Sequence, residues 1–153
     1  SALHALKRWD EALTHFERAT SIQPIFVFAH SNKGLTLTEL QQFEQAIVSF
    51  DKAIALQPDF VLAHFNRAVA LGKMQDYAGA IVGYDKTISL SPGHFEAYSN
   101  RGNALNELGR LKEAVQSFDA AISINPDFAV AHVNKSMAQL LMGDFDHGWD
   151  SFE

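Results

Sequence analysis

Four prolines divide the chain at equal intervals, and their sequence numbers rise in steps of 34: Pro24, Pro58, Pro92 and Pro126. A single globular fold does not require such regular spacing, whereas a tandem repeat produces it directly. When the sequence is shifted by one such step, residues of similar size and polarity align. The aligned sets are Ala12, Ala46, Ala80 and Ala114; Phe16, Phe50, Tyr84 and Phe118; Leu3, Leu37, Leu71 and Leu105; and the small residues Gly34, Ala68, Gly102 and Ser136.

Each repeat has the apolar periodicity of two helices. Leu105 and Leu108 precede Gly109, and apolar residues then recur at steps of three and four from Leu111 to Ile122. A turn is indicated between the two helices, at Gln41-Gln42, Gln75-Asp76, Gly109-Arg110 and Gly143-Asp144, and each proline ends a second helix. The sequence therefore predicts an all-α chain, organised as a single array over 1–153. Its complete helix-turn-helix units are 27–60, 61–94 and 95–128, with partial units at 1–26 and 129–153.

The small residues have a packing role in this prediction. In an antiparallel hairpin centred on the turn, Gly34, Ala68 and Gly102 lie level with the aromatic residues of the second helix. A missing side chain on one helix leaves room for a ring from the other helix. We therefore expect three such pairs, Gly34 with Phe50, Ala68 with Tyr84, and Gly102 with Phe118.

This pattern resembles the tetratricopeptide repeat (TPR) family over the whole chain: a small residue opposite an aromatic, alanine four positions before that aromatic, and proline eight positions after it. The resemblance implies a right-handed α-solenoid in which the first helices line a concave face. Two columns depart from the family pattern. Histidine or tyrosine replaces a larger aromatic at His30, His64, Tyr98 and His132, and a cation replaces leucine at Lys33, Arg67, Arg101 and Lys135.

An asparagine recurs once per unit, at Asn32, Asn66, Asn100 and Asn134, although asparagine is a mediocre helix former. A primary amide can accept a hydrogen bond from a backbone N–H and donate one to a backbone C=O, so a row of amides can hold an extended peptide. Helical spacing places further candidates beside this row. They are Phe28, Leu62, Phe65 and Val69 for apolar side chains, and Asn103 and Asn106 for polar ones. Alternatively, the asparagines were copied by duplication and bind only water or a neighbouring helix.

A narrower resemblance concerns residues 97–103 around Asn100. This setting is similar to the asparagine ladder in the TPR region of O-linked N-acetylglucosamine transferases, which implies backbone binding by the column. Residues 143–153, with Gly148, Trp149 and Phe152, are similar to the ends of TPR arrays that continue into a bacterial glycosyltransferase domain. An acceptor-recognition region of such an enzyme is therefore an alternative to a non-catalytic scaffold that binds an extended partner segment. No transferase residues are recognised in the chain itself.

The ends of the array suggest a third possibility, a self-assembling scaffold. The chain begins within a first helix and stops within a second one, without a polar capping helix at either end. This arrangement fits a segment of a longer protein, or ends that stack on other copies. The surface available for stacking would be Val130, Val133, Met137, Leu140 and Leu141.

Charged residues also recur once per repeat. Besides the cations at Lys33, Arg67, Arg101 and Lys135, acidic residues recur at Glu17, Asp51, Asp85, Asp119 and Glu153. Counted outward from the turns, the cations and the acids lie at about the same distance along their helices. We expect an ion ladder between helices, with ligand binding by the cations as the alternative. Some TPR proteins bind the C-terminal carboxylate of a peptide with Lys or Arg side chains next to the asparagines. This mode is disfavoured here, because the positions of those cations hold Phe28, Leu62, Glu96 and Val130.

Catalytic and metal-binding roles find no support in the sequence. His30, His64 and His132 lie in different units, which are about 10 Å apart or more, whereas a zinc ligand lies within about 2.1 Å of the ion. We expect them to replace an aromatic in the hairpin interface. No nucleophile elbow or phosphate-binding glycine loop accompanies the Ser, His and Asp residues. The predictions are therefore no catalytic residue, no metal and no cofactor.

Composition limits the partners further. Twelve Lys and Arg against eighteen Asp and Glu give a net charge of −6, without a basic run, which argues against nucleic acid. No apolar stretch approaches the ~20 residues of a membrane span, so membrane insertion is not expected. The chain has no cysteine, which is compatible with a reducing compartment, and we expect a cytoplasmic location.

Overall fold

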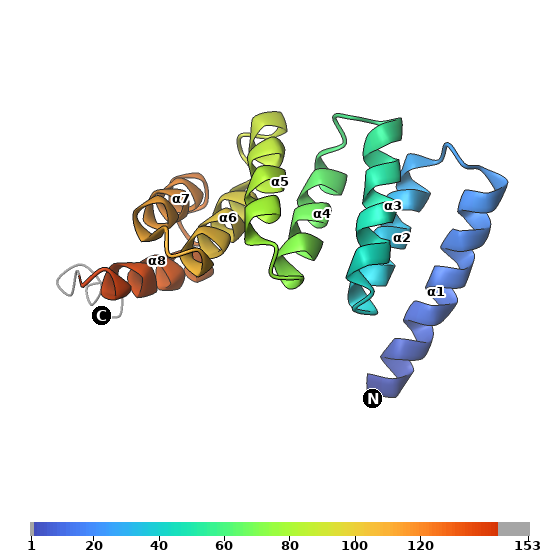
Figure 1. Ribbon diagram of the computed structural model, residues 1–153, viewed down its shortest axis with the longest axis horizontal. Helices are drawn as coiled ribbons and strands as arrows, with labels where there is room; N and C mark the ends of the chain where they lie inside the picture. Colours follow the sequence, from blue (N-terminus) through green and yellow to red (C-terminus); the bar gives the residue numbers. More distant parts are fainter. Residues whose placement is uncertain (1, 144–153) are drawn as a thin grey trace. The chain divides into compact units, whose positions relative to one another are not determined.

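The computed structural model describes residues 2–143, and within this range the regular elements are helices without strands (Figure 1). They are α1 (Ala2–Ile22), α2 (Val27–Glu39), α3 (Phe43–Leu56), α4 (Val61–Lys73), α5 (Tyr77–Leu90), α6 (Phe95–Glu107), α7 (Leu111–Ile124) and α8 (Ala129–Leu141). This confirms the predicted all-α class. None of these helices combines the length and hydrophobicity that a membrane span requires.

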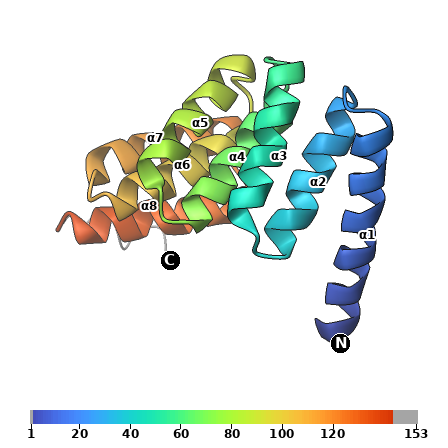
Figure 2. The same cartoon turned by 45° about the vertical axis from the view of Figure 1, so that its right-hand side comes forward.

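The chain forms two compact units, Ser1–Gln75 with α1 to α4 and Asp76–Glu153 with α5 to α8. In unit 1, each helix packs on the next one along the chain, and the first helices α2 and α4 also contact each other. Unit 2 repeats this arrangement, with a contact between its first helices α6 and α8. Figure 2 shows the consecutive packing of α1, α2 and α3. The helix pairs of two predicted repeats, α2 with α3 and α6 with α7, each pack within one compact unit, whereas the single array over 1–153 and its unit 61–94 remain a prediction.

The turn residues adopt the left-handed conformation that ends a helix tightly. The φ angles are 59° at Gln41, 65° at Gln75, 71° at Gly109 and 80° at Gly143. In the first of these turns, Gln42 N donates to Leu37 O at 2.8 Å and Gln41 N donates to Thr38 O at 3.0 Å. This pair of bonds is a Schellman motif, which satisfies carbonyls that have no partner inside the helix. Arg110 and Gly109 make the same two bonds to Leu105 and Asn106.

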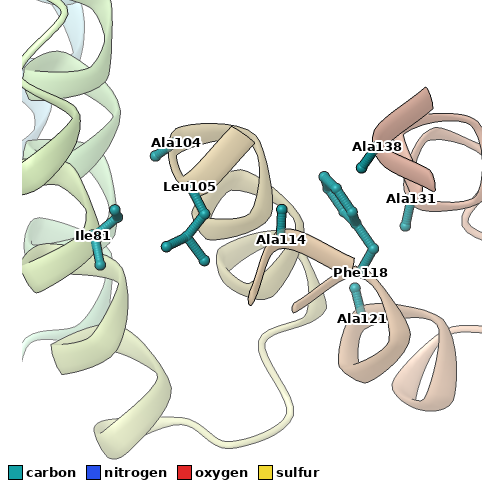
Figure 3. Packing of buried hydrophobic residues seen from close by; sticks show 8 residues of the cluster. All are labelled: Ile81, Ala104, Leu105, Ala114, Phe118, Ala121, Ala131 and Ala138. Carbon is teal, nitrogen blue, oxygen red and sulfur yellow. The ribbon is translucent and has the colours of Figure 1, made fainter. Parts of the chain in front are cut away.

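The expected ring-and-glycine pairs are present inside each unit. Phe50 and Phe118 are fully buried, and a Cβ atom built on Gly34 or Gly102 would lie 2.6 Å from Cε1 of the facing ring. Figure 3 shows the surroundings of Phe118, which are supplied largely by fully buried alanines: Ala114, Ala121, Ala131 and Ala138. The third pair, Ala68 with Tyr84, has one member in each unit and remains a prediction.

Some predictions concern residues beyond this range. Gly148, Trp149, Phe152 and Glu153 lie outside the described residues, as does the second helix expected after Gly143. The right-handed course of the array also remains a prediction.

We expect Gly102→Ala to lower the free energy of unfolding by about 1–2 kcal/mol, measured by urea denaturation. Overpacking against Phe118 typically costs ~1–3 kcal/mol and outweighs the ~1 kcal/mol that alanine gains over glycine in a helix. The double variant Gly102→Ala/Phe118→Leu should be less destabilised than the sum of its single variants. Strictly additive effects would contradict a direct contact between the ring and the glycine.

A second prediction concerns the turns. Gln41→Gly should raise the free energy of unfolding by about 1 kcal/mol, because glycine adopts a positive φ without the penalty of a side chain. Gly109→Gln is the reciprocal control and should destabilise by a similar amount. A Cβ at Gly109 has no neighbour within 4 Å, so only the backbone conformation is tested. Equal stability of Gly109→Gln and the parent protein would contradict this account.

Candidate functional site

The candidate face is formed by the first helices of the repeats, α2 with α4 in unit 1 and α6 with α8 in unit 2. All ten residues predicted for this face lie on these four helices: Phe28, Asn32, Leu62, Phe65, Asn66, Val69, Asn100, Asn103, Asn106 and Asn134. Their surroundings differ between the two units.

In unit 1, the face exposes apolar side chains. Phe28 is 56% exposed and Leu62 is 52% exposed, whereas Phe65 and Val69 are partly buried. Phe28 lies edge-to-face with Phe60, with ring centroids 5.3 Å apart. Phe26 also contacts Phe28, with centroids 6.3 Å apart. Such exposure of neighbouring aromatic rings is typical of surfaces that bind a partner.

Aromatic residues precede these helices, and they are not among the predicted site residues. One position of the repeat holds phenylalanine three times, at Phe26, Phe60 and Phe128, and His94 occupies it in the remaining repeat. The repeat spacing marks these residues, but they lie in the connection between units, where the pattern predicts only a helix boundary.

The asparagines of unit 1 differ from those of unit 2 in their hydrogen bonding. Asn32 is exposed and Asn66 is partly buried, and within the described residues neither side chain forms a hydrogen bond. Both amides therefore have free donors and acceptors. They lie on the same helices as the exposed rings, which places polar and apolar contacts on one face.

In unit 2, three of the four predicted asparagine side chains are bound to the protein itself. Asn134 Nδ2 donates to Asn103 Oδ1 at 2.8 Å, which links α8 to α6. Asn100 shares a side-chain hydrogen bond with the buried hydroxyl of Tyr84. The Oδ1 atom of Asn106 is buried without a hydrogen-bond partner among the described residues. The structure thus joins Asn134 with Asn103, a pair that we did not anticipate.

The third repeat also differs from the others at the start of its first helix. His94 Nδ1 lies 3.2 Å from Glu96 Oε2. The corresponding positions of the other repeats hold two apolar residues, such as Phe60 with Leu62. Unit 2 therefore carries a polar pair where unit 1 carries an apolar surface.

The four cations of the repeat are all paired with acidic side chains. The bonds join Lys33 to Glu17 at 3.2 Å, Arg67 to Asp51 at 2.6 Å, Arg101 to Asp85 at 2.7 Å and Lys135 to Asp119 at 2.7 Å. This confirms the ion ladder, and it shows that each cation pairs with the helix before its own rather than with the second helix of its own hairpin. The acidic partners are about half exposed, so each pair contributes about 0–1 kcal/mol.

The histidines bind the connecting loops. Nε2 of His30, His64 and His132 lies 2.8, 2.9 and 2.8 Å from the carbonyl oxygen of Pro24, Pro58 and Pro126, respectively. Because a carbonyl only accepts, each Nε2 carries the proton and donates. Among the described side chains, His, Asp and Glu form no group of three that could hold a metal ion.

Comparisons with known proteins identify the repeat. A family model described as "TPR repeat" matches residues 34–75, and one described as "Tetratricopeptide repeat" matches residues 95–128. No curated protein sequence matches the chain.

Solved structures are similar in fold. MamA from Desulfovibrio magneticus RS-1, residues 41 to the end, has a TM-score of 0.89 at 20% identity, covering 98% of this chain and 86% of MamA. YrrB, described as a TPR protein with an unusual peptide-binding site, has a TM-score of 0.80 at 19% identity, covering 98% and 77%. The first TPR of Spaghetti (RPAP3), bound to the HSP90 peptide SRMEEVD, has a TM-score of 0.75 at 21% identity, covering 76% and 93%.

The buried Tyr84 predicts a dependence of stability on alkaline pH. Burial raises the pKa of the Tyr84 hydroxyl to about 12, and the hydrogen bond with Asn100 partly opposes this increase. The unfolded chain loses this proton near the ordinary tyrosine pKa of ~10, whereas the folded chain keeps it. The free energy of unfolding should therefore fall as the pH rises from about 10 to 12, by up to ~2–3 kcal/mol.

Tyr84→Phe removes this titration, and its unfolding free energy should fall less steeply over the same range. Urea denaturation of both proteins at several pH values tests the difference. Identical slopes for the two proteins would show that the folded and unfolded states do not differ in the titration of Tyr84.

Proposed function

Because the chain is a tetratricopeptide repeat protein, we propose that it binds an extended segment of a partner protein along the first helices of its repeats, α2 and α4 in unit 1 and α6 and α8 in unit 2. Two proteins with the same fold support this proposal, namely the first TPR of Spaghetti, which is bound to an HSP90 peptide, and YrrB, which is described as having a peptide-binding site. The proposed role is that of an interaction scaffold, without chemistry of its own.

One observation carries the proposal: exposed apolar side chains and amides without a hydrogen bond among the described residues share one face of unit 1. Phe28 and Leu62 are more than half exposed, and Asn32 and Asn66 have amides that are not hydrogen-bonded among the described residues. An extended peptide presents backbone N–H and C=O groups to the amides and side chains to the apolar residues. Both kinds of contact are needed, since the amides alone recognise every sequence equally.

The two units should contribute differently. In unit 1, Phe28, Leu62 and the neighbouring Phe60 favour an apolar anchor side chain of the partner. In unit 2, Asn103, Asn106 and Glu96 favour polar side chains. A peptide that uses Asn134 must exchange the bond between Asn134 and Asn103, so we expect this amide to contribute less to affinity than Asn66.

The expected affinity is modest. A hydrogen bond contributes about 0.5–1.5 kcal/mol net, and immobilising a peptide costs ~4–15 kcal/mol before any contact contributes. Burial of an apolar anchor adds about 1.5–3 kcal/mol per side chain. Dissociation constants in the micromolar range or weaker follow from these values.

A second candidate is self-association through α8. The face of this helix exposes Val130, Val133, Met137 and Leu141 at 52%, 45%, 53% and 67%. Light scattering over a range of concentrations separates the two candidates, because a mass that stays monomeric contradicts self-association and leaves peptide binding untouched.

The decisive test is a peptide-display screen followed by titration of the selected peptides. Asn32→Ala/Asn66→Ala should weaken binding by roughly 10–30-fold, the value for two lost hydrogen bonds of about 1 kcal/mol each. Gln116→Ala removes an exposed amide from a second helix and should leave binding unchanged. Circular dichroism confirms that the variants are folded.

Two results would overturn the proposal. In one, no extended peptide is selected by the folded protein. In the other, peptides bind the folded double variant as tightly as the parent, and the asparagines are then remnants of repeat duplication.

A further inference from the structure

A groove lies between α1 and α3 in unit 1, and none of the predicted asparagines lines it. Its floor is α2, which packs against both helices, as Figure 2 shows. The groove holds two adjoining cavities of about 430 and 210 Å³. They share three lining residues, Thr20, His30 and Lys52.

The sequence explains why the groove is open at this point. Thr20 occupies a position that holds isoleucine in the following three repeats, at Ile54, Ile88 and Ile122. The side chain of threonine is smaller than that of isoleucine, so it fills less of the space above α2. The imidazole of His30 forms part of the floor, where it is 6% exposed and fixed by its bond to the carbonyl of Pro24.

The smaller cavity is polar and positively charged. Lys33 and Lys52 line it, and no acidic residue is among its described lining residues. The hydroxyls of Thr20 and Ser49 donate to backbone carbonyls of their own helices, so they offer no proton to a ligand. The lysine ammonium groups are therefore the strongest donors available there.

The charge of the site suits a single negative charge. Lys33 is paired with Glu17 at 3.2 Å, whereas Lys52 has no ion-pair partner among the described residues. The balance of Glu17, Lys33 and Lys52 is thus one positive charge. A carboxylate neutralises it, whereas a phosphate would leave an excess of negative charge beside Glu17.

The larger cavity is mainly apolar along Pro24, Ala55 and Leu56. It continues from the cationic cavity through the residues that the two share. A ligand that fits both cavities therefore has an apolar chain ending in one anionic group.

We propose that this groove binds a small amphiphilic carboxylate, with its carboxylate at Lys52 and its apolar chain along Pro24, Ala55 and Leu56. The corresponding residues of unit 2 argue that the site is particular to unit 1. There, Ile88 replaces Thr20, Tyr98 replaces His30, Glu113 replaces Gln45 and Ala120 replaces Lys52. These changes fill the space, remove the cation and add an acid.

The test uses octanoate as the probe and 1-octanol as an uncharged probe of the same chain length. Titrations of the whole chain are followed by amide chemical shifts in NMR spectra. Octanoate should shift residues of α1 and α3, and it should bind at least tenfold more tightly than 1-octanol, a ratio typical of one charge-assisted hydrogen bond.

Three variants locate the site. Lys52→Ala should weaken octanoate binding about tenfold and leave 1-octanol binding unchanged. Thr20→Ile should weaken both probes, because the longer side chain fills the shared space, while the fold is retained since isoleucine is native at the equivalent positions. Lys86→Ala is the matched control, since it removes an exposed lysine at the same position of the next repeat and should change neither titration.

The proposal fails if octanoate and 1-octanol bind equally, if the shifts map outside α1 to α3, or if the folded Thr20→Ile protein binds octanoate as the parent does. It does not depend on the peptide-binding face. Loss of octanoate binding in Lys52→Ala should leave the affinity for selected peptides unchanged.

Discussion

Each hairpin depends on an aromatic ring that occupies the space of a missing side chain. Phe50 enters the space beside Gly34, and Phe118 enters the space beside Gly102, with no room for a methyl group in either pair. The fully buried alanines around these rings allow close approach of the next helix as well. A densely packed interior does not tolerate changes in side-chain volume, so side-chain size stays constant at these positions of the repeat. The contact between ring and glycine also sets the register of the two helices.

A second set of interactions connects one hairpin to the next. Each cation column residue reaches back to an acid 16 positions earlier, and each histidine of the column binds the carbonyl of the preceding proline. Arg101 extends this role, since its Nε also donates to Ser117 Oγ at 3.0 Å and thereby contacts helices on both sides of α6. The departures from the family pattern at these positions are therefore explained by links between consecutive helices.

These links leave the exposed face of the first helices for binding, and they leave a second opening on the other side of unit 1. The peptide face combines rings with amides, whereas the groove of α1 and α3 combines a cation with an apolar wall. The peptide face uses the asparagine column that every repeat shares, whereas the groove lies where Thr20 departs from the isoleucines of the other repeats.

The sequence by itself determined the helices, their turns and the ring pairs, because each of these is specified within a single repeat by local periodicity and by size. It also determined which columns carry charge, amides and aromatic side chains. It could not decide the partners of those side chains, since residues at equal heights can pair forward or backward. Only the tertiary structure showed that Lys33 pairs with Glu17, that Asn134 binds Asn103 and that Asn100 binds Tyr84. The reason is physical: secondary structure follows from neighbours along the chain, whereas hydrogen-bond and ion partners follow from distances and side-chain orientations that are set when helices pack.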